Sequence, residues 1–270
     1  MAKKESIDIQ ILNWLKDNGY PFEMRIARSL KNNDIDVTQS HYYEDFESST
    51  SREIDIIGRM YGFKEPKNYV AIAELETFMT IECKSSPKPW IVFCETKPNP
   101  WSMRHALCNS HGEELIRRSG KTVGQTRIYK GSRSAGHGLA QAFAGNVDSP
   151  YAAVMATLKA AESQARQARK DDERIAIEHP DICGCSVTIP VVAITAPLYE
   201  CHLDDEGNPK LTQVAYSSLA FRYPGGEPRT KDATLVHVVT EAGFSDFTAS
   251  VKEFHNALMD RLDTLIPAET

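Results

Sequence analysis

Three charged residues stand out because they lie in two segments whose other residues are typical of buried β-strands. Asp55 stands between isoleucines in REIDIIG, and Glu82 and Lys84 flank a cysteine in TIECKSS. Charged side chains are seldom placed in half-buried apolar strands unless they are paired or bound to a metal ion. Two carboxylates offer the hard oxygen ligands that Mg²⁺ prefers, and an ammonium beside them stabilises developing negative charge. The pattern therefore predicts a divalent-cation site.

Side-chain alternation along a strand decides whether the three groups can meet. Glu82 and Lys84 are two residues apart, so they share one face of their strand, and Cys83 takes the other. Pairing of residues 53–59 with residues 78–86 would place Asp55 beside them. The alternative is a structural ion pair across the two strands, which is worth only about 0.2–1 kcal/mol.

Hydrophobic periodicity predicts the elements that hold these residues. We expect a helix that ends at Asn18-Gly19, a second helix from Pro21 with an apolar stripe of Phe22, Ile26 and Leu30, and strands over 35–43, 53–59 and 78–86. Residues 60–77 are expected to be a long loop. Further on we expect a helix over 150–170, strands over 188–196, 212–222 and 233–240, and a closing helix over about 245–265.

The order of these elements predicts an α/β fold in which helices flank a mixed central sheet. We expect a single domain over residues 1–270, with its core in residues 6–86 and 150–265. Residues 87–149, rich in proline and glycine, are expected to be a large irregular insertion with one or two helices.

A helix with Glu23, a strand, a strand with Asp55 and a strand with Glu82-Cys83-Lys84 together resemble the PD-(D/E)XK, or restriction endonuclease-like, nuclease superfamily. Ile54 stands where the motif of that family has proline. The resemblance implies a restriction-endonuclease-like sheet and a Mg²⁺ ion, replaceable by Mn²⁺, bound by Asp55, Glu82, the backbone carbonyl of Cys83 and Glu23. The catalytic residues it implies are Asp55, Glu82, Lys84 and Glu23.

The same resemblance implies an enzyme that hydrolyses DNA phosphodiester bonds, as an endonuclease in a bacterial anti-phage or restriction system. A partner protein would supply targeting or regulation, and a homodimer is an open option. Two alternatives also remain open. One is a catalytically inactive binding or assembly subunit with the same fold, and the other is an enzyme that cleaves RNA.

Charge along the chain is uneven, although the net charge of the 270 residues is −6. Residues 87–149 carry nine Lys/Arg against four Asp/Glu, between two acidic flanks. A basic middle permits a local phosphate-binding face. Within this segment, Arg127, Lys130 and Arg133 are predicted to contact nucleic acid, and a solvated loop is an equally open alternative. The resemblance to the nuclease superfamily implies that Lys159 and Gln164 on the helix over 150–170 face the active site and contact nucleic acid, and plain surface positions are equally open.

Neither a secretory signal nor a membrane-spanning apolar run is recognisable, and the six cysteines are irregularly spaced, so we expect reduced thiols in the cytoplasm. His105, Cys108 and His111 lack the usual zinc-ligand pairs, and a buried cysteine with two surface histidines is the favoured interpretation. Cys183 and Cys185 are likewise expected to be small apolar filler rather than a redox or metal pair.

Overall fold

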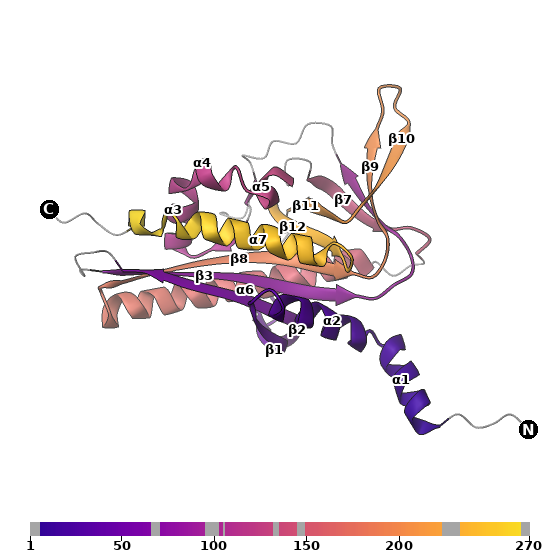
Figure 1. Cartoon of the computed structure of the whole chain (residues 1–270), viewed down its shortest axis with the longest axis horizontal. Coiled ribbons are helices and arrows are strands. Elements are labelled where there is room, and N and C mark those ends of the chain that lie inside the picture. The colour runs from indigo at the N-terminus through magenta and orange to yellow at the C-terminus, as the bar shows by residue number, and fades with distance from the viewer. Residues whose placement is uncertain are drawn as a thin grey trace, which may run out of the picture.

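The computed structural model describes residues 6–65, 71–94, 103–104, 106–131, 135–144, 149–222 and 233–265. Their strands join a single large mixed sheet, which helices cover on both faces (Figure 1). The predicted α/β class with a central mixed sheet flanked by helices is therefore confirmed. Among the described residues, no helix combines the length and apolar character that crossing a membrane requires.

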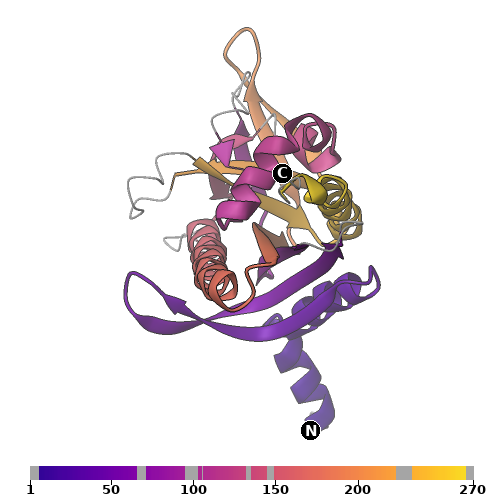
Figure 2. The same ribbon diagram turned by 90° about the vertical axis from the view of Figure 1, so that its left-hand side faces the viewer.

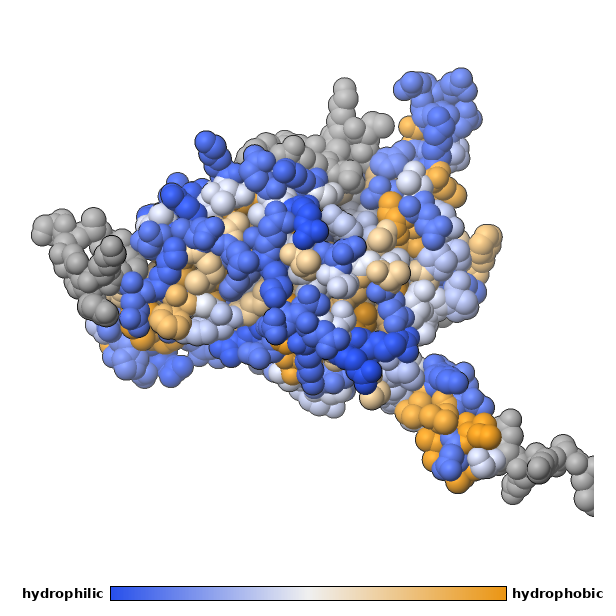
Figure 3. Space-filling model, viewed as in Figure 1, coloured by the Kyte–Doolittle hydropathy of each residue, from blue (hydrophilic) through white to orange (hydrophobic). Residues whose placement is uncertain are grey.

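Two helices open the described chain, α1 (Ile7–Asp17) and α2 (Tyr20–Lys31), and Gly19 joins them with a positive φ of 82°. The stripe of Phe22, Ile26 and Leu30 on α2 is buried, as the spacing predicts. Helix α1 buries none of its residues, so its apolar side chains gather on the protruding end of the molecule (Figure 3).

Three antiparallel strands follow, namely β1 (Asp36–Asp45), β2 (Thr50–Lys64) and β3 (Ile72–Lys84). Both β2 and β3 are longer than predicted. Much of the expected loop over 60–77 is paired strand, with Lys64 opposite Ala73. That prediction was wrong because this part of the hairpin exposes charged side chains, such as those of Arg59 and Glu76, which pair with each other across the strands.

The long helix α6 (Ser149–Glu178) returns the chain to a strand parallel to β3, β8 (Ile182–Ile194). Strand β12 (Ala233–Thr240) then pairs in parallel with β8. Helix α6 covers one face of these strands, and α2 and α7 (Phe244–Met259) cover the other face (Figure 2). The predicted closing helix ends at Met259 and is followed by a 3-10 turn over Leu262–Leu265.

Helix α6 is fixed to the sheet by a buried pair of threonines. Thr157 donates its hydroxyl to the carbonyl of Thr80, and the Thr80 hydroxyl lies 3.1 Å from the carbonyl oxygen of Thr157. The Thr157 hydroxyl also accepts the backbone N–H of Val191. These bonds tie α6 to both β3 and β8, which limits sliding of the helix over the sheet.

Residues 87–149 hold more regular structure than the irregular insertion that we predicted. Their described parts form β4 (Trp90–Cys94), β5 (Met103–Arg104), β6 (Leu107–Cys108), α3 (Ser110–Arg118), α4 (Gly120–Val123), α5 (Arg127–Gly131) and β7 (Gly136–Gln141). Strands β4 and β7 extend the central sheet beyond β11 (Tyr216–Phe221), together with β9 (Leu198–Leu203) and β10 (Pro209–Val214). The single strand predicted over 212–222 is thus two strands, and β9 was not predicted.

Candidate functional site

The antiparallel register of β2 and β3 brings Asp55 to Glu82. Ile56 pairs with Ile81, so the next positions along the two strands are Asp55 and Glu82. The backbone N–H of Cys83 donates a hydrogen bond of 2.7 Å to Oδ2 of Asp55. A side chain thus takes the place of a main-chain acceptor at the end of the ladder, and this fixes the Asp55 carboxylate against β3.

Lys84 joins the same group from the next position on its face of β3. Its Nζ lies 2.5 Å from Oε1 of Glu82, and the Glu82 side chain is only 11% exposed against 33% for Lys84. Cys83 points to the opposite face, where it packs in the core with Ile81. Only the backbone carbonyl of Cys83 is therefore suited to the metal-ligand role that the sequence suggests.

Glu23 reaches the group from helix α2. A Cβ built on Gly19 would come 3.7 Å from Cβ of Ser85, so the start of α2 lies against the end of β3. Partial burial raises the pKa of Glu23, and the charge of Asp55 raises it further. The structure thus brings together all four residues that were predicted as catalytic.

The electrostatics of this group show an excess of negative charge in a poorly solvated place. Burial raises the pKa of Glu82 to about 7, and the charge of Asp55 adds to the rise against the opposing effect of Lys84. Burial also raises the pKa of Asp55, although the Cys83 N–H and Lys84 oppose the rise. Carboxylates crowded in this way favour either a shared proton or a bound cation.

Comparison with protein-family models, with curated proteins and with solved structures finds no match to this chain. The chemistry of the site therefore has to be argued from its own residues.

The donor set fits a hard divalent cation. Asp55, Glu82 and Glu23 supply carboxylate oxygens from three different elements, and the positive charge of Lys84 acts on all three. Mg²⁺ takes oxygen ligands, usually one or two carboxylates, and fills its remaining positions with water and phosphate. A second positive charge would relieve the repulsion among these carboxylates.

Tyr43 on β1 is a neighbour of the site that sequence reasoning missed. Its hydroxyl lies 3.3 Å from the carbonyl oxygen of Ala156 on α6. Burial raises the pKa of Tyr43 to about 12, and the charges of Asp45 and Glu82 contribute. The predicted strand over 35–43 ends in His41-Tyr42-Tyr43, and the sequence does not distinguish Tyr43 within this run. Its place in the site depends on the contact between β1 and α6, which are distant in sequence.

Ser40 on β1 has the left-handed backbone conformation, with a φ of 51°. Its neighbours Gln39 and His41 pair with Ile56 and Ile54, so Ser40 stands opposite Asp55. For a residue with a Cβ this conformation costs about 1–2 kcal/mol. Such strain often concentrates at functional sites, where the surrounding structure maintains it.

Two of the predicted nucleic-acid contacts are engaged in ion pairs. Lys159 lies 2.8 Å from Oδ2 of Asp45, whose side chain is fully buried, and 2.7 Å from Oε2 of Glu47. Nε of Arg127 lies 2.9 Å from Oε2 of Glu253. Lys159 therefore anchors α6 to the end of β1, and its ion pairs and 13% exposure do not favour the nucleic-acid contact predicted for it.

The other three predicted contacts are placed differently. Lys130 is exposed on α5. Arg133 lies outside the described residues. Gln164 lines a groove of about 790 Å³ between β1 and α6.

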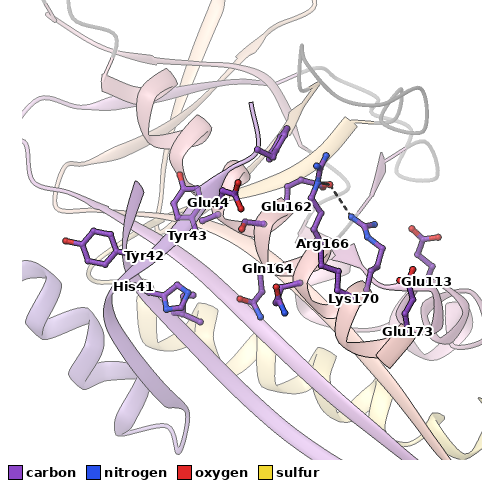
Figure 4. A pocket seen from close by; sticks show the side chains of 16 residues that line it. His41, Tyr42, Tyr43, Glu44, Glu113, Glu162, Gln164, Arg166, Lys170 and Glu173 are labelled. Carbon is purple, nitrogen blue, oxygen red and sulfur yellow. Dashed lines mark hydrogen bonds and ion pairs between the residues drawn. The ribbon is translucent and has the colours of Figure 1, made fainter. Parts of the chain in front are cut away.

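The groove carries charges of both signs. Figure 4 shows His41 and Tyr43 of β1 on one side of the groove and Glu162, Gln164, Arg166 and Lys170 of α6 on the other. Its acidic residues, Glu44, Glu113, Glu162 and Glu173, stand against Arg166, Arg169 and Lys170. Ion pairs of Arg166 and Arg169 with Glu162 further reduce its field. The groove walls therefore provide no net positive field for a polyanion.

Cys183, His111 and Asp172 form a second polar group. For these positions the sequence predicted a small apolar cysteine and a surface histidine. His111 Nδ1 lies 3.0 Å from Oδ2 of Asp172, which raises the pKa of His111 to about 10. Hydrogen bonds from Cys185 and from His111 lower the pKa of Cys183 to about 5. Cys108 is buried, and His105 lies outside the described residues. Because these residues come from α3, α6 and β8, no local pattern signals their meeting.

Proposed function

We infer that this chain is a Mg²⁺-dependent nuclease that hydrolyses DNA phosphodiester bonds. The observation that carries the proposal is the meeting of Asp55, Glu82 and Glu23 beside Lys84, where the pairing of β2 with β3 ends. Mn²⁺ is expected to replace Mg²⁺, since both accept oxygen ligands in octahedral geometry.

The order and direction of the elements support a restriction-endonuclease-like fold. Helix α2 precedes the antiparallel strands β1, β2 and β3, and α6 then leads to β8, which is parallel to β3. The carboxylates lie on the two middle strands of this unit, as the resemblance to the PD-(D/E)XK superfamily implies. The proposed fold and the proposed site thus rest on the same four strands.

Each side chain has a role that follows from its position. Asp55, held by the Cys83 N–H, and Glu82, held beside Lys84, would bind the cation with fixed orientations. The bound cation would supply the charge that polarises a scissile phosphate and activates water. Lys84 would orient the attacking water or neutralise the charge that develops on the phosphate. Glu23 would complete the oxygen set from the side of α2.

The test is a cleavage assay on supercoiled plasmid, linear duplex, single-stranded DNA and RNA, each with Mg²⁺, with Mn²⁺ and with EDTA. We expect metal-dependent cleavage of DNA. Lys84→Met and Asp55→Asn should lower the rate about 100- to 1,000-fold, the effect expected when one transition-state contact is removed. Glu74→Gln is the matched control, because Glu74 is a partly exposed glutamate on the far part of β3, where Tyr61 donates a hydrogen bond to it.

The outcomes separate the alternatives. Cleavage of RNA alone would replace the proposed substrate but keep the site. Nucleic-acid binding without cleavage under any metal would favour an inactive binding module. Cleavage that survives both Lys84→Met and Asp55→Asn would remove these residues from the active centre.

A further inference from the structure

A second group of metal-binding side chains lies in the outer half of the sheet, away from the elements that hold Asp55 and Glu82. Cys94 on β4 and Glu200 and His202 on β9 each offer one ligand atom, and these atoms all lie within 4.8 Å of one another. Cys94 is buried, and Glu200 and His202 are partly buried. Our interpretation of the sequence did not single out any of the three.

The strands themselves set this arrangement. Strands β4 and β9 are parallel, with Val92 beside Glu200 and Phe93 beside Cys201, so Cys94 comes next to His202. Glu200 and His202 are two residues apart and share one face of β9. The register between β4 and β7 shifts at Cys94, where Gly136 approaches so closely that a Cβ on it would meet Val92 at 2.3 Å. The ligands thus stand on packed strands rather than on loops.

Glu200 is also oriented from a third strand. The hydroxyl of Ser217 on β11 donates a hydrogen bond of 2.7 Å to Oε1 of Glu200. The other oxygen, Oε2, lies 3.5 Å from Nε2 of His202. The Glu200 side chain is only 17% exposed and that of His202 is 31% exposed. Ligating carboxylates are commonly held by an outer hydrogen bond of this kind, which fixes the direction of the metal-facing oxygen.

The mixture of atoms indicates which metal fits. A thiolate, an imidazole nitrogen and a carboxylate oxygen suit Zn²⁺, whereas Mg²⁺ and Ca²⁺ select oxygen alone. Three protein ligands leave the fourth tetrahedral position open, and the 31% exposure of the His202 side chain gives the site access to solvent. We propose that Cys94, Glu200 and His202 form a Zn²⁺ site with one open position, which links β4 to β9 and differs in metal class from the Asp55–Glu82 site.

Cobalt provides a direct test, because Co²⁺ takes zinc ligands and its thiolate complex absorbs in the near ultraviolet. The full chain carrying Asp55→Asn is stripped of metal and titrated with Co²⁺ and then with Zn²⁺. We expect one equivalent of Co²⁺, a thiolate band, and displacement of the Co²⁺ by Zn²⁺. Cys94→Ser should abolish the band, and Glu200→Gln and His202→Ala should weaken Zn²⁺ binding by more than about tenfold. Ser217→Ala should weaken it about 10- to 100-fold.

Two cysteine variants serve as controls that assign the cobalt–thiolate band to Cys94. Cys201→Ser, next to the ligands on β9, and Cys183→Ser, beside His111, should leave it intact. A band that persists in Cys94→Ser, or that disappears in Cys183→Ser, would overturn the assignment. So would the absence of stoichiometric Zn²⁺ binding, which would leave a buried cysteine beside a histidine–glutamate pair. Circular dichroism checks folding, and if Cys94→Ser unfolds, the partly exposed Glu200 and His202 variants decide.

Discussion

The Asp55 carboxylate accepts the backbone N–H of Cys83 at 2.7 Å, in a place where it also stands opposite the acidic Glu82. The hydrogen bond stabilises the charged form of Asp55, and the repulsion from Glu82 destabilises it. The balance between a hydrogen bond and a like-charge neighbour makes this residue sensitive to a bound cation, and the two effects can be separated by substitution.

Asp55→Asn should keep an acceptor for the Cys83 N–H and remove the repulsion with Glu82. In EDTA we expect this variant to be as stable as the wild type or more stable, measured by urea unfolding. Mg²⁺ or Mn²⁺ at 100 times its Kd should stabilise the wild type by about 2.7 kcal/mol and leave Asp55→Asn unchanged. Asp55→Ala should lose about 1–3 kcal/mol in EDTA, because it leaves the N–H without its acceptor. Equal cation stabilisation of wild type and Asp55→Asn would contradict the proposed metal ligand.

Lys159→Met should destabilise the fold rather than weaken nucleic-acid binding. Lys159 bonds Asp45, whose side chain is fully buried, and its removal leaves that carboxylate only Arg52 and the Glu47 N–H. Loss of one hydrogen bond to a charged group costs about 1.5–3 kcal/mol. Urea unfolding at neutral pH measures the loss. Lys170→Met, on the same helix, is the control and should change stability by less than about 0.5 kcal/mol. A Lys159→Met protein with wild-type stability and reduced DNA affinity would restore the surface role predicted from the sequence.

The buried carboxylate of Asp45 also makes the stability of the fold depend on pH. Burial alone would raise the pKa of Asp45, but hydrogen bonds from Lys159, from the Glu47 N–H and from Arg52 outweigh it and lower the pKa. A carboxyl whose folded pKa is depressed contributes stability above its unfolded value of about 3.9 and loses it as the pH falls further. The wild type should therefore lose more stability than Asp45→Asn between about pH 5 and pH 2. Parallel stability curves for the two proteins would argue against the shift.

The parts of the fold that could be predicted from sequence are those with a strong local pattern. The stripe of Phe22, Ile26 and Leu30 gave α2, and the apolar run before Thr240 gave β12 with its observed bounds. Alternation around Asp55 and Glu82 was enough to predict which side chains could share a face. The pairing of the two strands, on which the candidate site depends, was a hypothesis from the sequence and is a feature of the structure.

What could not be predicted depends on contacts between distant segments. Strands β4, β7 and β9 are short, and they exist because they pair with one another in the sheet rather than because their sequences favour it. His111 meets Cys183 across 72 positions of sequence, and Cys94 meets His202 across more than 100. No local periodicity carries such information.

Cys183 should react with iodoacetamide unusually fast at low pH. Its pKa of about 5 makes it a thiolate across the neutral range, whereas the hydrogen bond to Cys183 and then burial raise the pKa of Cys185 and keep it protonated. The alkylation rate at Cys183 should rise through about pH 5 and be flat from pH 6 to pH 8, measured by peptide mass spectrometry. His111→Ala should move this midpoint upward, because it removes a donor to the thiolate. If the alkylation rate of Cys183 in the wild type instead rises near the ordinary thiol pKa of about 8.5, the hydrogen bonds to Cys183 from Cys185 and His111 do not form.

Ser40→Gly offers a test of the backbone opposite Asp55. Glycine adopts a positive φ without the cost of about 1–2 kcal/mol that a residue with a Cβ incurs, and this relief offsets the extra entropy that glycine gains in the unfolded chain. We therefore expect stability equal to the wild type or higher by up to about 1 kcal/mol. Thr38→Gly, two residues earlier on β1 in the ordinary extended conformation, should instead lose about 0.5–1 kcal/mol. If both glycine variants lose stability equally in urea unfolding, Ser40 does not have the left-handed conformation, and the β1 backbone opposite Asp55 is regular.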